Sequence, residues 1–140
     1  MLSNPLDRNQ NDDPRLLRQL LGRAHDLASR HALHSVVVGM AGFEGDPEYP
    51  EIVDFVVSAL RVDDAVFRMT RERTLLLLAD VDASRAREII NRVIDDYRES
   101  FPSTADPAVA IGYYEVAPGS DDVTVKHVLP TVFADLPRAH

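Results

Sequence analysis

The sequence predicts an α+β domain in which a mostly antiparallel β-sheet is flanked by helices. Stretches with apolar residues at helical spacing alternate with short runs rich in valine or leucine. Two of these short runs are separated by only a few polar residues, as in a β-hairpin. After a first helix the order is therefore β-α-β-β-α-β-α, which suits the ferredoxin-like split βαβ arrangement.

The chain begins with a polar, turn-rich lead-in segment, residues 1–13, followed by what we expect to be one domain over residues 14–140. Asp13 is a suitable N-cap and Pro14 fits the first position of a helix over residues 14–33. One face of that helix is apolar: Leu16, Leu17, Leu20, Leu21, Ala24, Leu27 and Ala28.

A buried strand is predicted over residues 34–43, because three valines follow one another without alternation. Residues 44–50, "EGDPEYP", read as a loop. A second helical stripe follows it, formed by Ile52, Val53, Val56, Val57 and Leu60. Residues 65–69 and 74–81 are the two strands of the hairpin, joined by a charged turn.

The last third of the chain predicts an amphipathic helix over residues 83–100, a strand over 108–116 and a terminal helix over 125–136. Pro130 should interrupt or bend that terminal helix, because proline lacks the N–H that a helix interior needs.

Composition restricts the function. The net charge of −8 argues against a nucleic-acid or anionic-membrane surface. The chain has no cysteine, and no apolar run approaches the roughly 18 residues of a membrane span. We therefore expect a soluble cytoplasmic domain. The five histidines show no pair with the spacing of metal ligands, so neither a metal nor a cofactor is predicted.

Four segments resemble, in order, the motifs of the GGDEF family, the diguanylate cyclases that make cyclic di-GMP from two GTP molecules. "NPLDRNQNDD" (residues 4–13) stands where the family has a "DPLTGLPNRR"-like turn, and "GMAGFE" (39–44) where it has "DIDHFK". "RMTRERTLLLL" (68–78) aligns without a gap on "RLGGDEFAILL", and "AIG" (110–112) on "SIG".

The departures from the family pattern imply a degenerate domain without cyclase activity. Gly39 replaces a metal-binding carboxylate, and Glu72 alone is a poor magnesium site. Thr70 and Arg71 replace the two glycines that let phosphate approach the hairpin backbone, and Glu44 replaces a basic phosphate contact. The segment that reads guanine in active members is missing. A sensor that still binds GTP through Arg68, Glu72 and the hairpin is the least favoured alternative.

The resemblance also implies a surviving ligand site. "RVDD" places Arg61 and Asp64 in the register of the family's inhibitory R-x-x-D pair, which binds the product cyclic di-GMP. Arginine can donate to guanine O6 and N7, and a carboxylate can accept from the N1–H and N2–H₂ edge. Arg92 on the following helix is the candidate for the second arginine, with Arg87 as the weaker choice.

Two functions remain open at this point. The chain is either an inactive cyclic di-GMP receptor, in which ligand-linked dimerisation is plausible, or an inactive module that binds a protein partner or a second copy and no nucleotide. In the second case Arg61 and Asp64 are only a surface pair near a helix end. Arg71 and Arg73 at the hairpin tip, within residues 69–74, would then offer a charged surface.

Overall fold

A computed structural model describes residues 12–102, 109–120 and 123–134 of the chain. Its element order is α1 (Pro14–His31), β1 (Ser35–Ala41), α2 (Tyr49–Ser58), β2 (Ala65–Thr70), β3 (Arg73–Ala79), α3 (Ala83–Ser100), β4 (Ala110–Val116) and α4 (Val125–Val132). The four strands form one sheet in the order β2-β3-β1-β4, and each neighbouring pair is antiparallel. The predicted α+β class and strand arrangement are confirmed.

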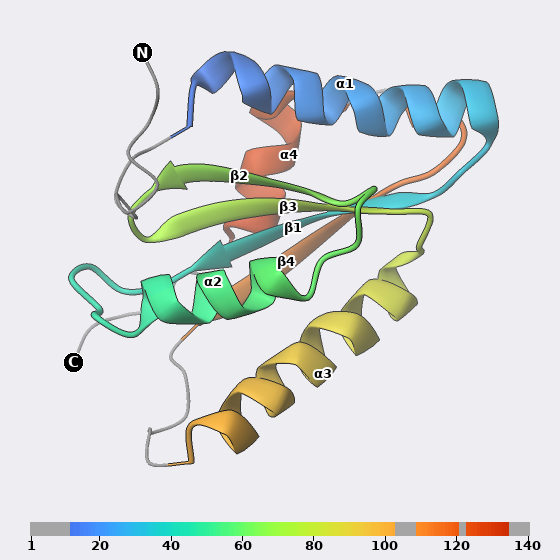
Figure 1. Cartoon of the computed structure of the whole chain (residues 1–140). Coiled ribbons are helices and arrows are strands. Elements are labelled where there is room, and N and C mark those ends of the chain that lie inside the picture. Colours follow the sequence, from blue (N-terminus) through green and yellow to red (C-terminus); the bar gives the residue numbers. More distant parts are fainter. Residues whose placement is uncertain (1–11, 103–108, 121–122, 135–140) are drawn as a thin grey trace.

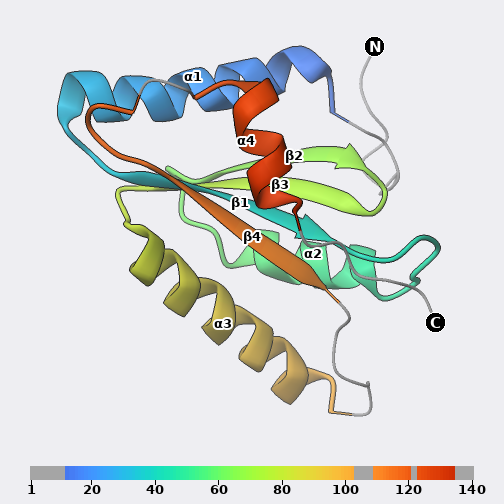
Figure 2. The ribbon, with the colours of Figure 1, turned by 180° about the vertical axis from the view of Figure 1, so that it is seen from behind.

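Helices cover both faces of the sheet (Figures 1 and 2). α1 and α4 lie on one face, and α2 and α3 lie on the other. All seven residues of β1 are buried, and alternate side chains enter the two cores. The two central strands therefore carry near-continuous apolar sequence although the sheet is antiparallel.

The helix ends follow local chemistry. Asp13 caps α1, because its carboxylate accepts the Arg15 backbone N–H at 2.9 Å. α1 ends where Ala32 adopts a left-handed conformation with φ of 54°. Asp82 caps α3 in the same way as Asp13 caps α1, accepting the Arg85 N–H at 2.8 Å.

The predicted start of α2 was wrong, and so was the first alternative for Pro130, an interruption of the terminal helix. α2 begins at Tyr49, inside the segment expected to be a loop, because Pro50 suits the first turn of a helix and Tyr49 is buried against the sheet. Pro130 does not interrupt α4, which continues to Val132. The predicted strand start at 108 and helix end at 136 lie outside the described residues, as does most of the lead-in segment.

α4 packs unusually close to the backbone of the sheet. Gly39 of β1 and Gly112 of β4 are register partners, and both lie beneath Val132. A Cβ atom at Gly112 would stand 2.3 Å from the Val132 carbonyl oxygen, which is backbone and has little room to move. Glycine at these two positions allows the close approach of α4.

We expect Gly112→Ala to lower the free energy of unfolding by about 1 to 3 kcal/mol, because the added methyl group overpacks this contact. Gly22→Ala is the matched control: a Cβ there meets nothing within 4 Å in α1, so it should raise stability by about 0.5 to 1 kcal/mol. Urea denaturation of the three proteins checks both values. Equal stability of the Gly112→Ala variant and the parent would contradict the close approach of α4.

Candidate functional site

The Arg61–Asp64 turn connects α2 to β2 and is fastened to the end of β3. Within the turn, the Asp64 N–H donates to the Arg61 carbonyl at 3.0 Å. The Asp64 carboxylate accepts the Arg61 backbone N–H at 2.8 Å and the Ala79 backbone N–H at 3.0 Å. Only 4% of the Asp64 side chain is exposed, so this carboxylate is a buried structural acceptor and not the surface partner expected from the sequence.

The Arg61 side chain lies above this turn with 54% of its surface exposed. One terminal nitrogen, Nη2, donates to Asp64 Oδ1 at 3.4 Å and also to the Ala79 carbonyl oxygen. Nε and Nη1 make no hydrogen bond to any residue that the structure describes. Nη2 is thus held in place, and the N–H groups of Nε and Nη1 can each donate to an acceptor, on different sides of the guanidinium.

A hollow of about 230 Å³ opens beside this arginine, between α2 and α3. Its wall combines one carboxylate and two arginines with an apolar surface, and consists of Val56, Ala59, Leu60, Arg61, Asp64, Val81, Arg85, Ile89, Ile90 and Val93. A mostly apolar hollow with a few converging polar groups is the usual form of a small-molecule site.

The second arginine on this wall is Arg85, which is not among the arginines predicted from the sequence to bind the ligand. Arg92 is exposed on α3 two turns further along, about 10 Å by helix geometry, and does not line the hollow. Arg85, Ile89 and Arg92 share a helix face, and this spacing could have identified Arg85 from sequence. The guanidinium of Arg87 instead lies 4.4 Å from the Tyr113 ring centroid, away from the hollow.

At the opposite end of the sheet, the positions that the resemblance assigns to catalysis are closed by contacts within the chain. A Cβ at Gly39 would stand 2.8 Å from side-chain and backbone atoms of Val132, so a metal-binding side chain has no room there. Glu72 Oε1 accepts the Gly45 N–H at 3.3 Å, and the Glu72 carbonyl accepts the Gly42 N–H at 2.8 Å. Glu44 lies exposed on the same loop.

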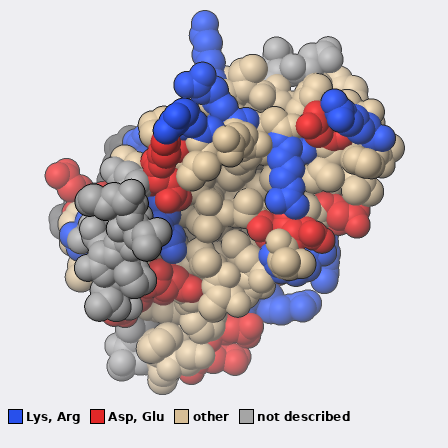
Figure 3. Space-filling view, turned by 45° about the horizontal axis from the view of Figure 1, so that its top comes forward, with Lys and Arg blue, Asp and Glu red and all other residues tan. Residues whose placement is uncertain are grey.

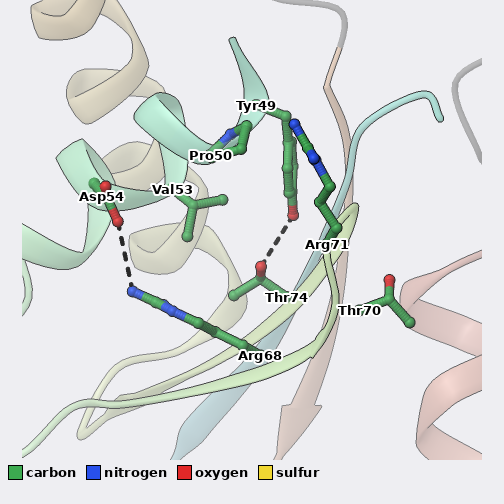
Figure 4. A pocket seen from close by; sticks show the side chains of 8 residues that line it. All are labelled: Tyr49, Pro50, Val53, Asp54, Arg68, Thr70, Arg71 and Thr74. Carbon is green, nitrogen blue, oxygen red and sulfur yellow. Dashed lines mark hydrogen bonds and ion pairs between the residues drawn. The ribbon is translucent and has the colours of Figure 1, made fainter. Parts of the chain in front are cut away.

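The substituted hairpin residues line a hollow too small for phosphate (Figure 4). Arg71 lies beside Tyr49, whereas the Thr70 side chain points away from Tyr49 and Arg68. The residues surround a space of about 20 Å³, which is enough for one water molecule. Arg68 forms an ion pair with Asp54 at 3.6 Å, while its Nη1 is buried without a hydrogen-bond partner in the described part of the chain. Such a group suits an ordered water.

Arg73 follows the hairpin tip, and its guanidinium carbon lies 5.4 Å from the centroid of the Phe133 ring. Arg71 is exposed at the tip, whereas Arg73 is half-buried by this contact. The expected charged surface over residues 69–74 is therefore centred on Arg71. Among the described residues, no group of three or more histidine, aspartate or glutamate side chains could hold a metal ion.

Tyr49 fastens α2 beneath the hairpin. Its hydroxyl donates to the Met40 carbonyl at 2.9 Å and lies 3.1 Å from Thr74 Oγ1. Its ring fills the space above Gly42, where a Cβ would lie 2.6 Å from the ring. Burial raises the pKa of Tyr49 from 10.0 to about 12.

No protein-family model matches the sequence, and no curated protein matches it. Similarity is found among solved structures. The FimX GGDEF domain from Pseudomonas aeruginosa has a TM-score of 0.70 at 9% identity, covering 94% of this chain and 90% of that chain. The GGDEF domain of DgcB from Caulobacter crescentus, in complex with c-di-GMP, has a TM-score of 0.61 at 12% identity, with coverage of 86% and 84%.

A third similar structure is the diguanylate cyclase SiaD from Pseudomonas aeruginosa in complex with its activator SiaC. Its TM-score is 0.64 at 22% identity, covering 82% of this chain and 50% of that chain, so this chain spans half the length of that cyclase chain. The chain therefore has the fold of GGDEF domains, and the GGDEF-like class predicted from the sequence is confirmed at the level of the fold. No helix in the described segments is long and apolar enough to cross a membrane.

We expect that Gly39→Asp will not create a magnesium site. The carboxylate would collide with Val132 in a buried contact, so stability should fall by about 2 kcal/mol or more. Gly22→Asp, the same change at an exposed helix position, should change stability by only about 0.5 kcal/mol or less. Thermal unfolding with and without Mg²⁺, together with an assay of GTP turnover, checks this. A magnesium-dependent rise in the melting temperature of Gly39→Asp would contradict it.

The Tyr49 hydroxyl should make stability depend on alkaline pH. This tyrosine ionises at about pH 10 in the unfolded chain and only at about pH 12 in the folded chain. Its contribution to the free energy of unfolding is therefore complete below pH 10 and is lost as the pH rises to 12. Two pKa units correspond to about 2 to 3 kcal/mol. Relative to Tyr49→Phe, the parent should lose that amount between pH 9 and pH 12 in denaturant titrations. Parallel curves would contradict the assignment.

Proposed function

We propose that this chain is a catalytically inactive GGDEF-like domain that binds cyclic di-GMP in the hollow between α2 and α3. The observation that carries the proposal is the arginine fork of Arg61. It is oriented by Asp64 and Ala79, it is half unoccupied, and it stands at the edge of a hollow of about 230 Å³. The GGDEF domain of DgcB, which has a similar fold, was solved in complex with c-di-GMP.

The wall of the hollow suits a purine attached to a phosphate. Guanine presents two acceptors, O6 and N7, on one edge, and a guanidinium fork can donate to both. Leu60 and Ile89 supply apolar surface against which a flat base can pack. Arg85 on the wall, and Arg92 two turns along the same face of α3, are the groups that we assign to the phosphates.

The ligand carries two negatively charged phosphates, and the chain has a net charge of −8. Binding therefore requires positive side chains close to the hollow. Basic and acidic side chains are interspersed over the face shown in Figure 3, and this face does not form one acidic field. Around the hollow, Asp64 is buried and paired with Arg61, and Glu88 is paired with Arg85 at 3.0 Å. Arg61 and Arg85 are thus the exposed charged side chains of the wall, with the exposed Glu88 carboxylate beside Arg85.

The proposed inactivity is supported by the closed end of the sheet. Gly39 has no space for a metal-binding side chain, the Glu72 carboxylate accepts a backbone N–H of the neighbouring loop, and the hairpin hollow is the size of one water. Magnesium-dependent transfer of a nucleotide needs carboxylates free to hold the ion and room for the phosphates.

The rival function is a module that binds protein and no nucleotide. This function is supported by the Asp64 carboxylate, which accepts the backbone N–H groups of Arg61 and Ala79, as expected for a turn with only a structural role. SiaD, another protein of similar fold, was solved in complex with a protein activator, SiaC. The exposed Arg71 at the hairpin tip would be the starting point for locating such a partner or a second copy.

Calorimetric titration with cyclic di-GMP tests the proposal. We expect micromolar or tighter binding to the parent and none to Arg61→Ala. Arg61→Lys should weaken binding about tenfold or more, because lysine keeps the charge but not the fork. Arg18→Ala removes an exposed charge on α1 and should bind like the parent.

Absence of binding to the folded parent would contradict the receptor function and favour the protein-binding module. Circular dichroism of each variant separates loss of the ligand contact from loss of the fold, which matters because Arg61 also donates to Ala79.

A further inference from the structure

Asp64 has little capacity left to read a ligand. A carboxylate offers about four acceptor positions. Oδ1 takes the Ala79 N–H and the Arg61 guanidinium, and Oδ2 takes the Arg61 backbone N–H. The fourth position is shielded, since only 4% of the side chain is exposed. Turning this carboxylate toward a ligand would take the acceptor from two backbone N–H groups, of which the Ala79 N–H is partly buried, and this is unfavourable.

Among the residues that the structure describes, no other side chain on the wall can take over the role of acceptor. Apart from Asp64, the residues that line the hollow are apolar or are arginines, which only donate. Glu88, the nearest carboxylate along α3, is off this wall and is paired with Arg85. The side chains of the hollow therefore present donors to a ligand base and no free acceptor.

The edges of a purine differ in whether they present hydrogen-bond donors or acceptors. The O6 and N7 edge of guanine consists of acceptors, whereas its N1–H and N2–H₂ groups are donors that need an acceptor. Adenine replaces O6 with the N6 amino group, which would point a donor at the donors of Arg61. Hypoxanthine keeps O6, N7 and N1–H but lacks the N2 amino group.

Building on the proposed function, we infer that this site reads the O6 and N7 edge of the base through Arg61 and leaves the exocyclic N2 amino group unread. The ligand class is thus a cyclic dinucleotide of 6-oxopurines, and guanine and hypoxanthine are equivalent to the site. Asp64 is a positioning residue: it orients Arg61 through its carboxylate and does not contact the base.

Calorimetric titration of the folded parent with cyclic di-GMP, cyclic di-IMP and cyclic di-AMP tests this inference. The hypoxanthine analogue should bind within about threefold of cyclic di-GMP. The adenine analogue should bind about tenfold or more weakly, because a carbonyl acceptor has become a donor.

Each alternative result has a distinct meaning. If cyclic di-GMP binds and cyclic di-IMP is about tenfold or more weaker, an acceptor reads the N2 amino group. The inference is then overturned while the receptor function stands. Equal affinity for the adenine analogue overturns the reading of O6 by Arg61. Silence with all three ligands overturns both the inference and the proposed function.

Discussion

The complete burial of β1 is the constraint on which the other elements depend. Its seven residues pair with β3 on one side and β4 on the other, and its side chains enter both cores. A strand that is apolar on both faces is stable only if helices cover both. α1 and α4 therefore take one face and α2 and α3 the other, and the hairpin and the α2–β2 turn fall at opposite ends of the sheet.

The packing of side chains differs between these two ends of the sheet. Near Ala41, the space above the strands is filled by α4 on Gly39 and by the Tyr49 ring on Gly42. Near Ser35, the register partner Ala79 is held by Arg61 and Asp64, and a hollow remains between the two helices. The contacts that fill the space near Ala41 and the hollow near Ser35 thus lie at opposite ends of the same strand.

The fold could be predicted from sequence because its determinants are local, such as the three valines of β1, the cap at Asp13 and the helical stripe of α3. The site could be predicted only in part. Sequence placed Arg61 and Asp64 together, but it did not reveal the direction of the Asp64 carboxylate. That direction depends on Ala79, which lies far along the chain and contributes only backbone atoms. Arg85 lies on the same face of α3 as Ile89 and Arg92, so helical spacing could have identified it, but sequence did not show which turn of that face borders the hollow.

The edge of the sheet at β2 is protected by the residue that precedes the α1 cap. Asp12 donates its N–H to the Arg68 carbonyl at 2.9 Å and accepts the Arg68 N–H on its carboxylate at 2.8 Å. An exposed edge strand invites hydrogen bonding by another chain, through which proteins aggregate or exchange strands. With both backbone groups of Arg68 engaged, a foreign strand cannot pair through the middle of β2. Loss of Asp12 would thus leave both backbone groups of Arg68 open to pairing with another chain.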